Sequence, residues 1–380
     1  MKPLARMIIG LLGVWTQVSD AHKHSDSYLT LTQPAQGTVL DGQWDISLRD
    51  LEHAVGVDAN ADGAITWAEL KAREAALTRY AFSRLTVESI AQGERGSCPL
   101  RPRELLFDEH VDGGYAVVRF SVECRFRPAQ LIVHYRLLFD LDPNHRGLLD
   151  VRAADQHQAL VLSKEGNMTT VNLDSPDRLR QFRAFVAEGM WHIWTGYDHI
   201  LFLVTLLLPA VVVYRARHWE PRASLRDSII DVLKVVTAFT LAHSLTLSLA
   251  VCGLVSLPSR WVESGIALTV LLGALNNLFP IVRDRRWAVA FAFGLIHGLG
   301  FASVLADLGL RSWNLALALV GFNVGVEVGQ LAIVLVFIPV AFGLRGTRFY
   351  RSAFMPGGAT AIGCIAIYWL AIRLAGVGLQ

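Results

Sequence analysis

The sequence predicts a polytopic α-helical membrane protein, with about six transmembrane helices preceded by a mostly β extracytoplasmic domain. Three observations support this fold class. Hydrophobic residues form 53% and charged residues only 18% of the 380 residues, which is more apolar than an ordinary soluble enzyme. The apolar residues gather in long runs after residue 193, whereas residues 22–189 are mixed and charged. A short apolar segment, preceded by basic residues, begins the chain.

The first 21 residues form a predicted signal peptide. Lys2 and Arg6 precede the apolar run Met7–Trp15, and Ser19-Asp20-Ala21 supplies the small residues that a signal peptidase reads. A first transmembrane helix is the alternative, but the run is shorter than the roughly 20 residues that a span needs. Cleavage after Ala21 would place the next domain outside the inner membrane of a bacterium.

The mature N-terminus that this cleavage creates is a separate candidate metal site. It would begin His22-Lys23-His24 with a free amine. A terminal amine, two amides and a third-position histidine can hold Cu²⁺ or Ni²⁺ in a square plane. The alternative is a solvated tail.

The exported domain, residues 22–174, is predicted to be mostly β with a helical insert. Apolar and polar residues alternate with the period of two that is typical of strands packed on one face. The segments with this alternation are Ser27–Thr32, Tyr115–Phe126, Leu131–Leu141 and Met168–Leu173. Leu70–Thr86 is instead predicted to be helical.

Two of the four cysteines, Cys98 and Cys124, lie in this domain. Because an oxidising compartment permits disulfides, we predict a bridge between them that stabilises the fold by about 3 kcal/mol. Cys252 and Cys364 lie in apolar runs, and no pair has the CxxC spacing of a zinc or redox site.

The sharpest local motif is the segment Asp58–Glu69 (DANADGAITWAE), which matches an EF-hand calcium loop. Oxygen donors alternate along it, and Gly63 stands where the loop turns sharply. The predicted calcium ligands are Asp58, Asn60, Asp62, the Ala64 carbonyl, Thr66 and Glu69. The alternative is a solvated acidic turn without affinity. Because only one good loop is visible, a structural site is expected rather than a paired sensor.

Residues 175–192 predict an amphipathic linker helix between the two parts of the chain. Leu179, Phe182, Phe185 and Val186 form its apolar stripe. Such a helix is expected to rest on the bilayer surface before the first span.

Six apolar runs within residues 193–375 are long enough to cross a bilayer. The predicted spans are Ile193–Tyr214, Asp231–Val255, Trp261–Val282, Trp287–Leu308, Trp313–Phe342 and Phe354–Leu374. Arginine is concentrated in the first, third and fifth loops, whereas the other two carry only Arg260 and Arg311. The positive-inside rule therefore predicts cytoplasmic basic loops and extracytoplasmic mature termini.

Ionisable side chains inside these spans are the main functional signal, because lipid makes them costly unless they serve a purpose. The candidate transition-metal ligands are His192, Asp198, His199, His243, His297 and Glu327. Supporting polar residues are Ser244, Glu263, Asn323 and Gln330. On one straight helix His192 and His199 would be too far apart to bind one ion, so they are interpreted as two levels of a path, or as ligands completed by other helices. The alternative is that each polar side chain only joins neighbouring helices by hydrogen bonds.

Four segments of this region resemble the HupE/UreJ family. They are GMWHIWTGYDHILF (residues 189–202), FTLAHSLTL (239–247), FGLIHGLGFA (293–302) and FNVGVEVGQ (322–330). The resemblance covers roughly residues 185–375 and implies a small membrane protein associated with nickel supply to hydrogenase or urease, thought to be a permease. His192, Asp198 and His199 match the family's first-helix histidine and Asp-His pair. The large exported domain departs from the short family members.

Three functions are compatible with these residues. The first is transport or handling of a divalent transition metal, with nickel preferred and zinc as the alternative ion. The second is an intramembrane zinc hydrolase that uses the same ligands. The third is a non-catalytic sensor or assembly factor whose exported domain binds a protein. No nucleotide motif is visible, so transport would use a gradient, and a net charge of +2 gives no indication of nucleic acid binding.

Overall fold

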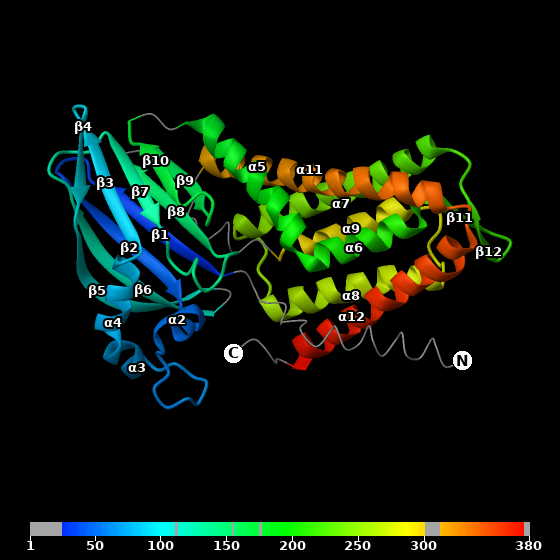
Figure 1. The fold of residues 1–380 in the computed structure, drawn as a ribbon, viewed down its shortest axis with the longest axis horizontal. Helices are drawn as coiled ribbons and strands as arrows, with labels where there is room; N and C mark the ends of the chain where they lie inside the picture. The colour runs from blue at the N-terminus through cyan, green and yellow to red at the C-terminus, as the bar shows by residue number, and fades with distance from the viewer. Residues whose placement is uncertain (1–24, 111–112, 154–155, 175–176, 301–311, 376–380) are drawn as a thin grey trace.

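The computed structural model describes residues 25–110, 113–153, 156–174, 177–300 and 312–375. A mostly β region lies at one end of an elongated molecule and a bundle of helices forms the rest (Figure 1). This confirms the prediction of a β region followed by apolar helices. The predicted signal peptide and His22-Lys23-His24 lie outside the described residues.

Two sheets form the β region. The strands of the larger sheet, in the order β5-β6-β2-β1-β8-β9, are β5 (Leu100–His110), β6 (Gly113–Glu123), β2 (Val39–Ser47), β1 (Asp26–Gln33), β8 (Arg146–Ala153) and β9 (Gln156–Leu162). The smaller sheet contains β10 (Met168–Asn172), β7 (Gln130–Tyr135), β3 (Leu85–Ala91) and β4 (Glu94–Cys98) in that order. Among the described strands of these two sheets, β1 and β8 pair in parallel and the other pairs are antiparallel.

Side chains from both sheets meet in one apolar core. Its largest fully buried members include Trp44, Phe120 and Tyr135. Cys98 and Cys124 form a disulfide, which is the predicted pairing. His145 is also buried, between the Ser25 hydroxyl on Nδ1 and the Tyr135 hydroxyl on Nε2, each at 2.6 Å. Burial, with the nearby Arg146 charge, lowers the pKa of His145 to about 3, so this imidazole is neutral.

Two sequence predictions for this region are wrong in extent. The strand predicted over Leu131–Leu141 ends at Tyr135, and Leu138 has a left-handed φ of 59° that no strand accommodates. The helix predicted over Leu70–Thr86 is divided at Arg73 into α3 (Trp67–Ala72) and α4 (Glu74–Phe82), and β3 already begins at Leu85. A further helix, α2 (Leu48–Val55), precedes them.

The helical part contains long apolar helices and shorter ones. Its elements are α5 (Arg178–Thr195), α6 (Tyr197–Leu207), a 3-10 helix (Leu208–Val211), the hairpin β11 (Val212–Arg215) and β12 (His218–Pro221), α7 (Leu225–Val251), α8 (Ser259–Leu278), α9 (Arg286–His297), α11 (Ser312–Leu344), a π-helical turn (Tyr350–Phe354) and α12 (Met355–Ala375). Among the described residues, α7, α8, α11 and α12 are long and apolar enough to cross a membrane, and the pair α5–α6 adds a fifth candidate if it counts as one broken span.

The first and fourth predicted spans differ from these helices. The first, Ile193–Tyr214, is not one straight helix, because α5 and α6 meet at Gly196 at an angle of 73° and a hairpin follows. The fourth, Trp287–Leu308, corresponds at its start to the shorter α9, and its end falls in residues 301–311, outside the described part.

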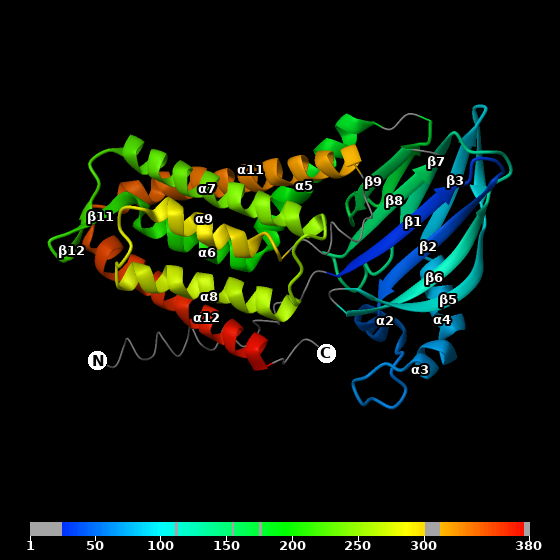
Figure 2. The same cartoon turned by 180° about the vertical axis from the view of Figure 1, so that it is seen from behind.

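The β region rests on α5 and α11. Phe185 of α5 and Ala318 of α11 are buried against Tyr28, Leu148 and other side chains of the larger sheet. The predicted linker helix is thus part of α5, which packs along α11 instead of standing apart from the bundle. The loops that carry most of the arginines lie at the opposite end, where the β11–β12 hairpin stands (Figures 1 and 2).

Candidate metal centre

Three histidines from three helices meet inside the bundle. His192 of α5, His199 of α6 and His243 of α7 each offer a ring nitrogen, and these atoms all lie within 4.8 Å of one another. His199 and His243 are buried, with 6% and 0% of their surface exposed, and His192 is half-buried. Distances of this order allow one ion to contact all three imidazoles after small side-chain adjustments.

The bend at Gly196 brings the first two histidines together. Gly196 has φ −75° and ψ 93°, which interrupts the helix, and α6 leaves at 73° to α5. The ring centroids of His192 and His199 are therefore only 4.6 Å apart. The sequence-based argument that these two residues are too far apart to bind one ion assumed one straight helix, and the bend removes that separation. The other sequence interpretation, ligands completed by another helix, agrees with the position of His243.

Polar neighbours orient two of the rings. His199 Nδ1 donates to Asp198 Oδ1 at 3.0 Å, and His243 Nδ1 donates to Asn323 Oδ1 at 3.3 Å. The Asn323 amide nitrogen donates a hydrogen bond of 2.8 Å to the Leu319 carbonyl, which directs the Asn323 amide oxygen toward His243. Within the described chain, no hydrogen bond reaches the buried Nε2 atom of His199 or of His243. Such anchoring of one ring nitrogen with the other left open is typical of metal-ligating histidines.

Glycines allow the helices to approach closely enough to form this site. A Cβ on Gly189 of α5 would overlap the Phe322 carbonyl oxygen of α11, and one on Gly325 would overlap the Val186 carbonyl oxygen. Gly294 of α9 and Gly298, directly after its end, similarly face backbone atoms of α7. Small residues at helix contacts are typical of membrane bundles.

His297 lies beside the three-histidine group without belonging to it. Its ring centroid is 5.1 Å from that of His199, and its Nε2 shares a hydrogen bond of 2.9 Å with the Thr269 hydroxyl. It is 1% exposed, and no described residue hydrogen-bonds its buried Nδ1 atom. The sequence could not identify Thr269 as its partner, because that requires the pairing of α8 with α9.

The polar stripe of α11 faces α7, but its members do not meet at one point. Glu327 Oε1 accepts from the Thr237 hydroxyl at 2.9 Å, and Gln330 Oε1 accepts from Thr240 at 3.1 Å. Only Asn323 reaches a histidine of the group. Glu327, one of the six candidate metal ligands, thus lies outside the three-histidine group.

Two other predicted polar residues have local partners. The Ser244 hydroxyl donates to the Thr240 carbonyl at 2.7 Å. Glu263 accepts from Ser259 at 2.7 Å and pairs with Arg373 at 3.6 Å, at the end of α8 nearer the β region. The Ser244 bond stays within α7, whereas the Glu263–Arg373 pair joins α8 to α12.

The predicted calcium loop connects α2 to α3. The side chains of Asp58, Asn60 and Asp62 accept hydrogen bonds from backbone N–H groups of the loop, and Gly63 has a φ of 83° at the sharp turn. Glu69 turns back to accept from Thr66 and from Ala59 N. The hydrogen bonds from Thr66 lower the pKa of Glu69, which keeps it ionised.

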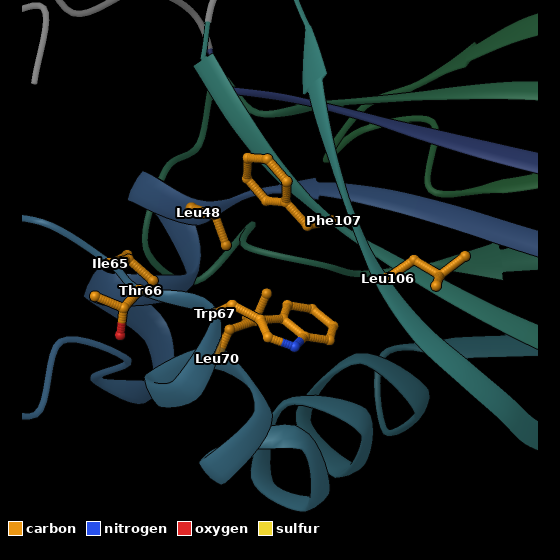
Figure 3. A pocket seen from close by; sticks show the side chains of 7 residues that line it. All are labelled: Leu48, Ile65, Thr66, Trp67, Leu70, Leu106 and Phe107. Carbon is orange, nitrogen blue, oxygen red and sulfur yellow. The ribbon is translucent and has the colours of Figure 1, made fainter.

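An apolar hollow of about 480 Å³ lies beside this loop. Figure 3 shows the side chains of α2, the loop and α3 opposite those of β5. The lining residues are Leu48, Ile65, Thr66, Trp67, Leu70, Leu106 and Phe107. Trp67 and Phe107 are half exposed, at 50% and 52%.

A comparison with known families agrees with the sequence resemblance. The family described as HupE / UreJ protein matches residues 168–373, which is more than half of the chain. The chain belongs to the HupE/UreJ family. Together with the apolar helices, membership in the HupE/UreJ family makes it a membrane protein. No curated protein matches the chain. The three-histidine group and the contact of Gly189 with α11 lie within the part matched by the HupE/UreJ family, whereas most of the β region precedes it.

Proposed function

We propose that this protein binds a divalent transition metal ion between His192, His199 and His243 and moves it through the membrane. Ni²⁺ is the preferred candidate ion. The observation that carries the proposal is that ring nitrogens of the three histidines lie within 4.8 Å of one another. In addition, the Nδ1 atoms of His199 and His243 are anchored, whereas no described residue hydrogen-bonds their buried Nε2 atoms. Association of the HupE/UreJ family with nickel or cobalt transport or metallocentre assembly supports it.

The chemistry of the three imidazoles suits nickel, cobalt or zinc, which prefer nitrogen ligands. Asp198 would hold the His199 ring in the orientation that binds, and its negative charge would offset part of the charge of the ion. Asn323 would do the same for His243 without a charge. A site with one formal negative charge and no thiolate binds less tightly than a structural zinc centre, and a carrier must release its ion.

The proposal includes an orientation in the bacterial inner membrane. Arginine-rich loops at the end opposite the β region support a cytoplasmic position for that end, and hence an extracytoplasmic β region and C-terminus. His243 would then lie about 12 Å below the extracytoplasmic end of α7, given eight residues to Val251 at 1.5 Å each. Ions would therefore reach the site from outside.

Metal binding by the chelator-stripped full-length protein tests this proposal. We expect one Co²⁺ or Ni²⁺ per chain, visible Co²⁺ absorption bands of a nitrogen-ligated ion, and accumulation of Ni²⁺ in vesicles that contain the protein. Binding without accumulation in vesicles would contradict transport. No binding at all would contradict the proposed site.

A zinc hydrolase is the second candidate, because three histidines around one buried position leave a fourth position for water. Zinc that survives chelation at one ion per chain would favour this candidate over a carrier. Vesicle accumulation of Ni²⁺ would favour the carrier.

We also propose that the loop Asp58–Glu69 binds calcium and stabilises the helical insert of the β region. The turn at Gly63 and the return of the Glu69 carboxylate to the loop support this role. Extracytoplasmic calcium modules bind weakly, with dissociation constants of about 10⁻⁴ to 10⁻³ M.

Terbium luminescence tests the calcium proposal, since Trp67 stands within the loop and can transfer excitation energy to a bound Tb³⁺ ion. We expect luminescence that Ca²⁺ displaces at about millimolar concentration and that Glu69→Gln weakens at least about tenfold, because the closing Glu supplies two oxygens. Glu94→Gln, in a strand of the smaller sheet, is the control. Equal luminescence from both variants would contradict calcium binding by this loop.

A further inference from the structure

A carboxylate that the sequence analysis did not single out lies next to the three-histidine group. Glu188 stands on α5 four residues before His192, so both side chains leave the same face of the helix about one turn apart. Glu188 is on the side of His192 that faces the β region, and its side chain is 18% exposed. It is thus accessible in part, unlike His199 and His243.

The group that faces this carboxylate comes from the β region. Arg146, the first residue of β8, places Nε 3.9 Å from Glu188 Oε1 and its guanidinium 5.1 Å from the centre of the Trp191 ring. A separation of 3.9 Å is too long for a hydrogen bond. Within the described residues, no hydrogen bond to the Glu188 carboxylate is present, so both of its oxygens keep their capacity to accept.

The backbone of Arg146 is held firmly, which makes this contact a property of the fold. Its N–H donates to the Ser25 carbonyl at 2.9 Å, and Nη1 donates to the His145 carbonyl at 3.1 Å. His145 in turn lies in the core of the β region between Ser25 and Tyr135. Arg146 therefore offers Glu188 a positive charge from a fixed position, without a close hydrogen bond.

We propose that Glu188 is the outer ligand, which binds the divalent cation before the cation passes to His192. When no cation is bound there, Arg146 pairs with the Glu188 carboxylate. The inference rests on the proposed metal function. A carboxylate attracts a hydrated dication over a longer range than a neutral imidazole does, and transfer over one helical turn needs only a short step. Because Arg146 binds Glu188 loosely, a dication competes with it successfully.

This arrangement gives the β region a part in metal uptake. The outer ligand belongs to the helical bundle, whereas the charge that competes with the metal belongs to the β region. Binding of the ion to Glu188 displaces the Arg146 side chain toward Trp191. Movement of the ion to His192 restores the ion pair between Arg146 and Glu188. Successive sites of moderate affinity are what a conducting path requires.

The test separates the rate of metal loading from the affinity at equilibrium. Full-length protein is mixed with Co²⁺ in a stopped-flow instrument, and the Co²⁺ absorption of the histidine site is followed. We expect Glu188→Gln to load at least about tenfold more slowly, since charges at the mouth of a cleft change association rates by 10- to 1,000-fold. Equilibrium affinity should stay within about threefold of the unmodified protein, because the three histidines remain.

Three further variants make the outcome decisive. Glu188→Asp keeps the charge and should load at nearly the original rate; loading as slow as that of Glu188→Gln would indicate a packing role and overturn the proposal. Glu88→Gln removes a carboxylate that pairs with Arg95 in the smaller sheet and should leave the loading rate unchanged.

His243→Ala tests the three-histidine site itself. If His243→Ala loses Co²⁺ while Glu188→Gln loads at the original rate, the outer ligand is overturned and the proposed function stands. If His243→Ala still binds Co²⁺ normally, the proposed function fails.

Discussion

Replacement of His243 by alanine is expected to lower the affinity for Ni²⁺ by more than about 100-fold and to abolish accumulation of Ni²⁺ in vesicles. Among the described residues, His243 supplies one of three ring nitrogens that lie within 4.8 Å of one another. It is completely buried, so water replaces it poorly. Changes in residues that only orient metal ligands already cost about 10- to 100-fold, and loss of a ligand costs more. Isothermal titration of the stripped, full-length protein measures the change.

A graded series around His243 shows whether the loss comes from the ligand itself. Asn323→Ala removes the acceptor of His243 Nδ1 and should cost about 10- to 100-fold, less than the ligand does. His218→Ala removes an exposed histidine of the β11–β12 hairpin and should leave the affinity unchanged. Equal affinities for all three variants would exclude the three-histidine site, and a larger loss for Asn323→Ala than for His243→Ala would assign the metal to a different ligand.

The sequence identified the histidines of this site but not their arrangement. His192, His199 and His243 are conspicuous because an ionisable side chain in an apolar run is costly, and that signal needs no knowledge of the fold. Their grouping depends on the bend at Gly196. A glycine in an apolar segment indicates close packing as readily as a break, so the 73° angle was not predictable from its neighbours.

The expectation that Glu327 belongs to the same site failed for a geometric reason. Asn323, Glu327 and Gln330 share one helix face, which spacing alone predicts correctly. They also extend over about 10 Å of the helix axis, at 1.5 Å per residue, which is more than one ion can bridge. Each therefore meets a different residue of α7, and only Asn323 meets a histidine.

The β region was predictable only in part as strands, and not as a sheet. Alternation predicted the segments that became β1, β6 and β10 and most of β7, whereas β2, β3, β4, β5, β8 and β9 were not predicted. The parallel pairing of β1 with β8 joins segments more than a hundred residues apart, for which no local pattern exists. The same pairing places Arg146 opposite Asp26 and next to α5, so the contact between Arg146 and Glu188 also required the fold.

Replacement of Gly189 by alanine is expected to destabilise the helical bundle by about 3 kcal/mol and to weaken metal binding together with the fold. The added Cβ would overlap the Phe322 carbonyl oxygen and lie 2.9 Å from Val326 N, and both are backbone atoms that no rotamer change can move. Overpacking of this kind usually costs 1–3 kcal/mol, and the upper value applies because backbone must shift. Since α5 carries His192 and α11 carries Asn323, separation of the two helices disturbs the site from both sides.

Gly343 of α11 provides the matched control. A Cβ on Gly343 has no atom within 4 Å, so Gly343→Ala should stabilise the helix by about 0.5 to 1 kcal/mol. Thermal unfolding in detergent, followed by helical circular dichroism, compares the two variants, and Ni²⁺ titration of the folded fraction reports on the site. If Gly189→Ala unfolds at the temperature of the unmodified protein, α5 and α11 are not packed as closely as described. If it unfolds early but its folded fraction binds Ni²⁺ normally, the glycine contact stabilises the bundle without positioning His192, and the position of that ligand then depends on the bend at Gly196.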